Sequence, residues 1–186
     1  VLFRSIPLNT NGQIDEQAYR QVQMSRHSLD EIFDLCQAAL AGCGASTENA
    51  ASVAASVREA EAEGITNVGL GFTPYYCEHL LQGNIDGRVR PRVFDGGPAV
   101  VNVDAGDGFA HPAFDAGEAS LVCKARECGL AALSIRNVYY NGVEGYFARR
   151  LALRGLVGFA CTVAAAMAEP YGGNKPVFGT NPLAFG

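Results

Sequence analysis

The sequence of 186 residues lacks any apolar run of the ~18 residues that a transmembrane helix needs. It also lacks, near its start, the apolar core of a secretory signal peptide. These two absences predict a cytoplasmic protein that has no membrane partner. Charged residues are sparse at 18%, while apolar residues make up 48%, a balance that supports a packed core and argues against disorder.

Basic residues are few, and the formal net charge is −5. Small groups of arginines occur at 88–92 and at 149–154. The second group has helical spacing, and we interpret it as a solvated face near the C-terminus of a helix. This distribution predicts no nucleic-acid partner.

The cysteines show neither a C-x-x-C motif nor any cysteine–histidine spacing typical of a metal site. We therefore expect single buried thiols, with no disulfide and no bound metal. Any redox chemistry then has to be carried by a bound organic cofactor. The six residues are Cys36, Cys43, Cys77, Cys123, Cys128 and Cys161.

Both ends of the sequence differ from those of a typical natural domain. Met24 precedes a helix-capping pattern and is the expected start of the native chain, whereas IPLNTNGQIDEQAYRQ in residues 1–23 resembles the opening of the dihydrodipicolinate synthase family. We interpret residues 1–23 as an unrelated read-through or assembly product. The last residues, NPLAFG, are strand-like and lack a polar tail, so we expect a C-terminally truncated protein.

Three helices are predicted in the first half of the chain. The first covers 28–40 and begins with the capping box S-x-x-E, and the second covers 46–63. The third covers 73–83 and carries Pro74 at its first helical position. Together they predict an N-terminal helical segment over residues 24–90.

The second half predicts an incomplete α/β domain over residues 91–186. A loop rich in Gly, Pro and Arg is expected at 84–98, before the first strand. Strands and helices then alternate with short connections, which is typical of the α/β class. The expected order is strand 99–105, helix 113–128, strand 130–136, helix 143–154, strand 156–163, and a tail at 164–186 with a loop and one more strand-like segment.

Two glycine-containing turns are candidate binding sites. The turn at 137–142 lies between a strand end and a helix start, where ligands collect in α/β sheets and free N–H groups can meet a phosphate. The turns at 170–173 and 179–182 offer close backbone approach and hydrogen-bonding side chains. No G-x-G-x-x-G fingerprint is present. A plain strand-to-helix turn is the better explanation of the first segment taken alone, and a turn explains the second segment equally well.

Three longer stretches resemble the malate/L-lactate dehydrogenase family, from about residue 28 to residue 186. They are EAEGITNVGLGFTPYYCEHLLQGNIDGRVRP, RNVYYNGVEGYFARRLALRGLVGFA and PYGGNKPVFGTNPLAFG, of which GTNP is the most specific part. The resemblance implies a mixed-sheet NAD(P)-binding fold without the usual dinucleotide fingerprint, and a homodimer when the chain is full length. It also implies that Asn67 and Thr180 contact the substrate and that the cofactor is lined by Tyr140, Asn141, Gly142, Val143 and Glu144.

The sequence departs from this family at positions that carry chemistry. Val68 stands where the family has a proton-transferring histidine, and valine cannot move a proton. Phe72 replaces a carboxylate-binding arginine, and Tyr140 replaces a histidine. The resemblance therefore leaves the general acid and base unassigned.

Other residues are candidates for the missing catalytic group. Tyr76 and Tyr140 can donate a hydrogen bond to a substrate oxygen, although packing explains each of them equally well. His111 stands at a helix start after a strand, where a capping or turn role is the alternative. His27 and His79 are interpreted as surface residues.

The predicted activity is hydride transfer between NAD or NADP and C2 of a small 2-hydroxy acid, 2-oxo acid or cyclic imino acid. The small-molecule substrate and its reaction follow from the family resemblance. The alternative is a catalytically silent relative that binds a ligand or partner through the same fold.

Overall fold

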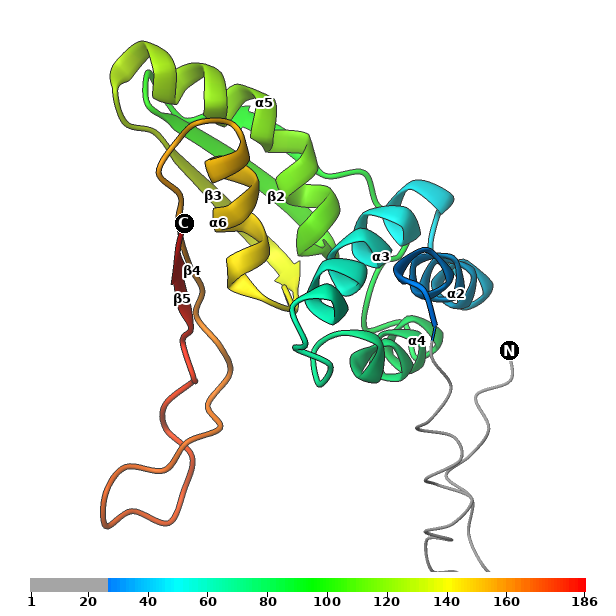
Figure 1. Ribbon diagram of the computed structural model, residues 1–186. Helices are drawn as coiled ribbons and strands as arrows, with labels where there is room; N and C mark the ends of the chain where they lie inside the picture. The colour runs from blue at the N-terminus through cyan, green and yellow to red at the C-terminus, as the bar shows by residue number, and fades with distance from the viewer. Residues whose placement is uncertain (1–26) are drawn as a thin grey trace, which may run out of the picture.

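The computed structural model describes residues 27–186, so the interpretation of residues 1–23 lies outside the described residues. Helices gather at one end of the molecule, a sheet covered by two helices forms the middle, and a long C-terminal arm projects from the far side (Figure 1). The predicted class, an N-terminal helical segment followed by a mixed-sheet α/β region, is confirmed.

Three α-helices build the first part of the described chain. They are α2 (Leu29–Gly42), α3 (Thr47–Ala62) and α4 (Thr73–Leu81), and the short 3-10 helix η1 (Leu70–Phe72) precedes α4. The predicted capping box is present, because the Ser28 hydroxyl accepts the Glu31 N–H while the Glu31 carboxylate accepts the Ser28 N–H. Local capping signals therefore place the helix starts correctly.

A three-stranded mixed sheet forms the middle of the molecule. β1 (Arg92–Asp95) is antiparallel to β2 (Val100–Phe109), and β2 is parallel to β3 (Ala132–Tyr139) after the crossover helix α5 (Ala110–Cys128). α5 and α6 (Glu144–Leu153) lie on the same face of this sheet (Figure 1). The opposite face carries no helix within the described residues.

Two sequence expectations about this sheet were wrong. The expected loop at 84–98 contains the strand β1, whose four residues are all exposed, so the strand leaves no alternating apolar pattern in the sequence. β2 extends four residues beyond the predicted end at Ala105, since Gly106 adopts a φ of +58° and the pairing shifts between Asp104 and Gly108. These glycines allow a bulge in the strand rather than ending it.

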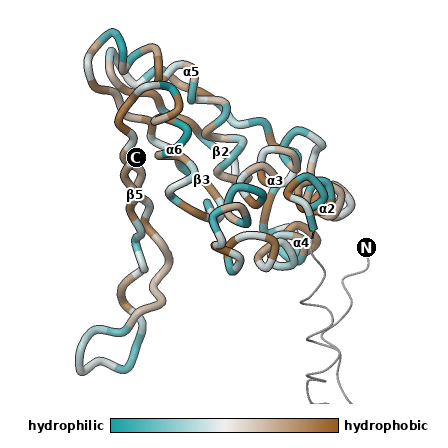
Figure 2. The backbone as a smooth tube through the Cα atoms, viewed as in Figure 1, coloured by the Kyte–Doolittle hydropathy of each residue, from teal (hydrophilic) through white to brown (hydrophobic). Residues whose placement is uncertain are grey.

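The C-terminal region forms a separate ribbon. β4 (Phe159–Cys161) pairs antiparallel with β5 (Leu183–Phe185), and both strands contact α6. The predicted strand at 156–163 is therefore shorter than expected and does not extend the main sheet. In Figure 2 the tip of the arm is mostly hydrophilic, whereas the ribbon near the C-terminus is more hydrophobic.

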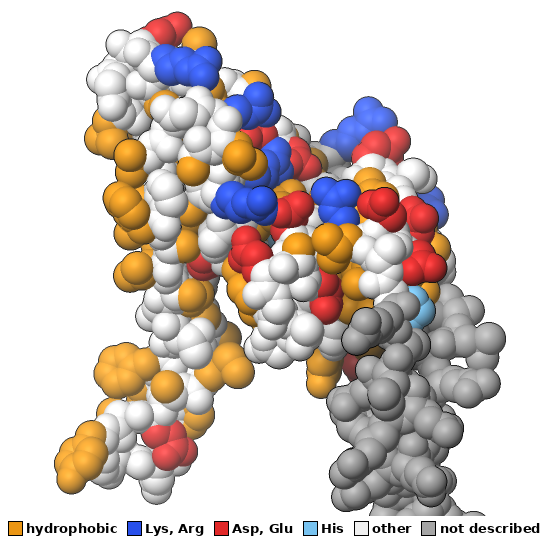
Figure 3. Space-filling model, viewed as in Figure 1, with side chains coloured by type: hydrophobic (Ala, Val, Ile, Leu, Met, Phe, Trp, Pro, Cys, Tyr) orange, Lys and Arg blue, Asp and Glu red, His pale blue; other side chains and the backbone are white. Residues whose placement is uncertain are grey.

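The arm exposes many apolar side chains, visible as orange patches on the part that stands apart from the main body in Figure 3. No element within residues 27–186 covers them. The exposed apolar residues from 157 onward are Val157, Phe159, Val163, Met167, Tyr171, Val177, Phe178, Leu183 and Phe185.

The cores of the helical segment and of the sheet meet at Phe109. This last residue of β2 is 1% exposed and packs into the helical cluster, as does the partly buried Tyr139 at the end of β3. A second cluster lies between β2, β3 and α5, and a third joins Phe114 on α5 to Phe147 on α6.

The expectation of single buried thiols holds for only part of the set. Cys36 and Cys77 are buried, and Cys43 is partly buried; all three pack in the helical core. Cys123 and Cys128 are exposed on α5, because they lie on its outer face, and Cys161 is exposed on β4. None of these cysteines forms a disulfide in the described structure.

Candidate functional site

The loop of residues 140–143 joins β3 to α6 at the carboxyl end of the parallel pair β2–β3. β3 runs to Tyr139, so this turn begins later than the predicted segment at 137–142. The carboxyl ends of parallel strands are the usual place for ligands in open α/β sheets. Four of the five predicted cofactor residues lie in this loop, and Glu144 begins the helix that follows.

The N-terminus of α6 has no side-chain cap. Its N-cap residue, Val143, provides no hydrogen-bonding side chain. The backbone N–H groups of Asn141, Gly142 and Val143 donate no hydrogen bond within the described part of the chain. These groups are consequently available to an acceptor brought by a ligand.

His111 lies directly behind this loop, in the first turn of α5. Its side chain is fully buried, and within the described structure neither ring nitrogen makes a hydrogen bond of good geometry. The imidazole stacks on Phe147, with 5.5 Å between ring centroids, and meets Tyr146 edge to face. The expected capping or turn role of His111 was wrong, because α5 starts at Ala110 and turns this side chain inward.

The environment keeps the His111 imidazole neutral. Burial lowers its pKa from 6.5 to about 4, and the nearby Arg150 cation acts in the same direction. Asp115 and the backbone of Asn141 oppose this shift. The ring therefore provides one acceptor nitrogen and one N–H donor at neutral pH.

Gly142 brings His111 and Tyr76 to one point. Its φ is +70°, and a Cβ added there would lie 3.6 Å from His111 Nε2 and 3.7 Å from Tyr76 Oη. Tyr76 comes from α4 and is 1% exposed, so the helical segment and the α/β region each contribute one polar group under this glycine.

Aromatic rings form one wall of the site. Phe72 stacks on Tyr140 at 4.6 Å and meets Tyr76 edge to face at 5.0 Å. Burial raises the pKa of both phenols, and the neighbouring Glu144 raises that of Tyr140 further. Both tyrosines therefore stay protonated and act as hydrogen-bond donors rather than general bases.

Glu144 adds a buried carboxyl group to the first turn of α6. The residue is 6% exposed, and burial raises its pKa, while a hydrogen bond from the Asn141 side-chain amide opposes the shift. A carboxylate at this helix end occupies the position that an anionic ligand would otherwise favour. The loop thus suits a neutral polar group better than a phosphate.

The other predicted site residues lie outside this cluster. Asn67 is exposed in the turn before η1, next to the partly buried Val68. Thr180 is exposed on the arm, which extends away from the loop in Figure 1. The structure brings Tyr76, His111 and the loop together, whereas neither Asn67 nor Thr180 forms a side-chain hydrogen bond with them within the described residues.

Sequence reasoning missed the role of His79. Its Nδ1 forms a hydrogen bond with the Tyr139 hydroxyl, and its side chain is half-buried, so the expected surface role was wrong. This bond ties α4 to the end of β3, immediately before the loop. Only the pairing of two distant segments reveals it, because the two residues are 60 positions apart.

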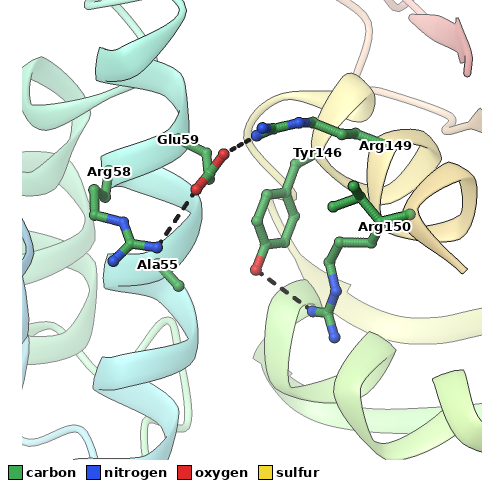
Figure 4. Close-up of a pocket in the computed structure, with 7 residues that line it drawn as sticks. Ala55, Arg58, Glu59, Tyr146, Arg149 and Arg150 are labelled. Carbon is green, nitrogen blue, oxygen red and sulfur yellow. Dashed lines mark hydrogen bonds and ion pairs between the residues drawn. The ribbon is translucent and has the colours of Figure 1, made fainter.

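A cavity of about 200 Å³ lies between α3 and α6, away from the loop (Figure 4). Glu59 sits between Arg58 and Arg149 at this cavity and pairs with both. Arg150 pairs with Asp115 and Glu118. These cations already have carboxylate partners, so the cavity is a structural junction rather than an anion site.

The arginines at 149–154 lie near the C-terminus of α6, where Arg149 and Arg154 are exposed as their spacing predicts, whereas Arg150 is partly buried. Each pairs with a carboxylate on another helix: Arg149 reaches α3, whereas Arg150 and Arg154 reach α5. Within residues 27–186, no group of three metal-ligating side chains occurs. In the same range, no helix is both long and apolar enough to cross a membrane.

Comparison with known proteins places this site in context. The sequence model described as malate/L-lactate dehydrogenase matches residues 27–186. The chain is 37% identical over 158 residues to a (2R)-3-sulfolactate dehydrogenase (NADP(+)) from Chromohalobacter salexigens, covering 85% of this chain and 47% of that protein. It is 35% identical over 159 residues to a Delta(1)-pyrroline-2-carboxylate/Delta(1)-piperideine-2-carboxylate reductase from Pseudomonas syringae pv. tomato, covering 86% of this chain and 46% of that protein.

The fold matches solved structures over the same part of the chain. The crystal structure of a delta1-piperideine-2-carboxylate reductase from Pseudomonas syringae pvar. tomato superimposes with a TM-score of 0.83 at 34% identity. The match covers 87% of this chain and 49% of that one. The chain thus spans about half the length of the curated relatives it matches.

Proposed function

Because the chain belongs to the malate/L-lactate dehydrogenase family, we propose that the full-length protein is an NAD(P)-dependent oxidoreductase. Its reaction is hydride transfer to or from C2 of a small 2-hydroxy acid, 2-oxo acid or cyclic imino acid. The observation that carries this proposal is the loop at 140–143, whose free N–H groups lie over the buried, unpaired His111 at the carboxyl end of a parallel strand pair.

The residues of this loop fit a nicotinamide cofactor. The backbone N–H groups that donate no hydrogen bond in this loop, and the buried His111 imidazole behind it, support the binding of a polar group here. When bound, the cofactor supplies or accepts the hydride. We assign its lining to Tyr140, Asn141, Gly142, Val143 and Glu144, and we leave the choice between NAD and NADP open.

The chain's own residues orient the substrate and exclude water in this proposal. Tyr76 and Tyr140 carry protonated phenols that donate hydrogen bonds to the reacting oxygen or nitrogen. Asn67 and Thr180 keep their proposed substrate contacts. Val68 supplies no proton, so the acid and base belong to other groups. We also propose that the working form of the full-length protein is a cytoplasmic homodimer.

Cofactor binding by the full-length protein tests this function. Titration with NADH and NADPH up to millimolar concentration is expected to shift or quench the cofactor fluorescence for at least one of them. Hydride transfer is then followed by cofactor absorbance with cyclic imino acids and 2-oxo acids. Absence of any fluorescence change with both cofactors would refute the proposal.

A second candidate is a catalytically silent family member that binds a ligand. The stacking of Phe72 on Tyr140 favours it, because both positions differ from the family pattern and their rings fill space between α4 and the loop. Cofactor binding without turnover on any substrate of these classes supports this reading. Measurable turnover eliminates it.

A further inference from the structure

Three aromatic side chains form a row beside the loop at 140–143. The ring centroid of Phe72 lies 4.6 Å from that of Tyr140, with 29° between the ring planes, and 5.2 Å from that of Tyr75, with 37° between the planes. Tyr75 and Tyr140 are 53% and 40% exposed. This aromatic row, defined as Phe72, Tyr75 and Tyr140, therefore presents ring surface to a ligand.

The aromatic row has no cation over its rings within residues 27–186, unlike several other rings of the molecule. An aromatic face attracts a positive charge, because its π-electrons give it a partial negative charge. Arginine side chains take this place, 4.9 to 5.9 Å from the ring centroid, elsewhere in the molecule. The rings that they cover are those of Phe33, Phe94, Phe114 and Tyr146. The aromatic row thus has room for a cation that a ligand brings.

The charged groups next to the aromatic row are carboxylates. Glu144 lies close enough to raise the pKa of Tyr140, and its Oε1 accepts a hydrogen bond from the Asn141 side-chain amide. Within the described residues, Glu144 Oε2 accepts no hydrogen bond. Glu61 accepts the N–H of Leu70 at 2.7 Å, at the start of the helical turn that carries Phe72. This charge pattern favours a cationic group over an anionic one.

We propose that the aromatic row and Glu144 bind a small organic cation, an ammonium or quaternary ammonium group that the substrate carries. The exposed ring faces contact the alkyl groups around the nitrogen, and the Glu144 carboxylate balances its charge. Among acids of the proposed classes, those with an amino or methylated amino side group meet this requirement, whereas dicarboxylic acids do not. The inference rests on the proposed function only in assigning the cation to the substrate.

Choline and its neutral analogue 3,3-dimethylbutanol test the proposal. The two molecules have the same shape, and a carbon atom of the analogue replaces the charged nitrogen of choline. Binding to the full-length protein is measured by saturation-transfer NMR, in a buffer without organic cations and at constant potassium chloride. Choline is expected to bind about three- to tenfold more tightly, the range of a partly exposed cation–π contact. Equal affinities, or no binding of either probe, would overturn the proposal.

Matched variants locate the site. Tyr75→Leu and Tyr140→Leu each remove one exposed ring and are expected to reduce the preference for choline. Glu144→Gln keeps the size of the side chain and should weaken choline while leaving the neutral analogue unchanged. Tyr171→Leu is the control, because Tyr171 is fully exposed on the arm, and it should keep the parent's preference. Circular dichroism melting shows which variants are folded; should Tyr140→Leu not fold, an unchanged preference in Tyr75→Leu overturns the proposal.

The same titrations with saturating NADH or NADPH separate this inference from the proposed function. If the protein prefers choline but binds neither cofactor, the proposed function fails while the cation site stands. If a cofactor binds and choline shows no preference over its neutral analogue, the cation site is refuted while the function stands. Displacement of choline by the cofactor would overturn the assignment of the cation to the substrate.

Discussion

Single residues at the loop set the properties of the site. His111, Tyr76 and Gly142 come from α5, α4 and the β3–α6 connection, and no local pattern links them. The sequence identifies His111 and Tyr76 as candidates, but the convergence of their polar atoms requires the packing of the helical segment against the sheet. Burial of an imidazole without a partner is a tertiary property.

The buried imidazole predicts a pH-dependent stability. The unfolded His111 takes up a proton near pH 6.5, whereas the folded one does so only near pH 4, so protonation favours unfolding. This contribution to the unfolding free energy is fully present above pH 6.5. It is lost as the pH falls towards 4, by a total of about 3 kcal/mol.

Urea unfolding of the full-length protein between pH 4 and pH 7 measures this loss. The His111→Phe variant retains the ring packing and is expected to show a smaller decrease over the same interval. Asp115 raises the pKa of His111 and Arg150 lowers it, so neither of these two residues is mutated in either protein. Identical pH profiles for parent and variant would contradict the prediction.

Substitution of Gly142 tests the backbone conformation of the loop. In Gly142→Ala the added methyl group meets His111 and Tyr76 at ordinary contact distance, so the cost comes from the positive φ. We expect a loss of about 1 kcal/mol in unfolding free energy and weaker cofactor binding. Gly145→Ala is the control, since Gly145 lies in α6 with no positive φ, and an added Cβ would meet only Val143, at an ordinary contact distance of 3.7 Å. This variant should be neutral or slightly stabilising.

At the scale of elements, helix boundaries are the best predicted feature. The capping box at Ser28 and the proline at position 74 are local signals, and the structure places α2 and α4 accordingly. β1 escaped prediction because an exposed edge strand of four residues depends on pairing with β2. The end of β2 was placed too early because glycine is typical both of turns and of bulges.

Ion pairs between helices contribute to stability at the scale of elements, and substitution of Arg150 tests this contribution. Arg150 is largely buried, pairs with Asp115 and Glu118, and lies 4.9 Å from the centroid of the Phe114 ring. We expect Arg150→Ala to lower the unfolding free energy by about 3 kcal/mol, because it leaves the buried Glu118 carboxylate with only a weaker partner. Chemical denaturation of the full-length variant measures this loss.

Arg149→Ala is the matched control on the next position of the same helix. The Arg149 side chain is 51% exposed and pairs with Glu59, so its removal should cost less than about 1 kcal/mol. Equal losses for both variants would show that the ion pairs of Arg150 contribute no more than a surface pair.

At the scale of the whole molecule, the exposed apolar arm determines how the described part behaves alone. The side chains of Phe159, Cys161, Leu183 and Phe185 on the β4–β5 ribbon are exposed, while Ala160 packs towards α6. Within residues 27–186, β3 ends the main sheet with an unpaired edge. Residues 24–186 expressed alone are expected to aggregate or to form a molten state. Size-exclusion chromatography and thermal unfolding test this, and a monomer that unfolds cooperatively would contradict it.

The position of Phe109 also limits where this chain can be joined to a relative in a chimera. A side chain from the end of β2 completes the interior of the three helices, so the boundary expected near residue 90 separates secondary-structure elements but does not separate their interiors. The helical segment is therefore poorly suited to exchange between relatives. In a chimera joined near residue 90, the exchanged helices must also fit around Phe109 and Tyr139. Recombination points that keep α2 through β2 together preserve this shared interior.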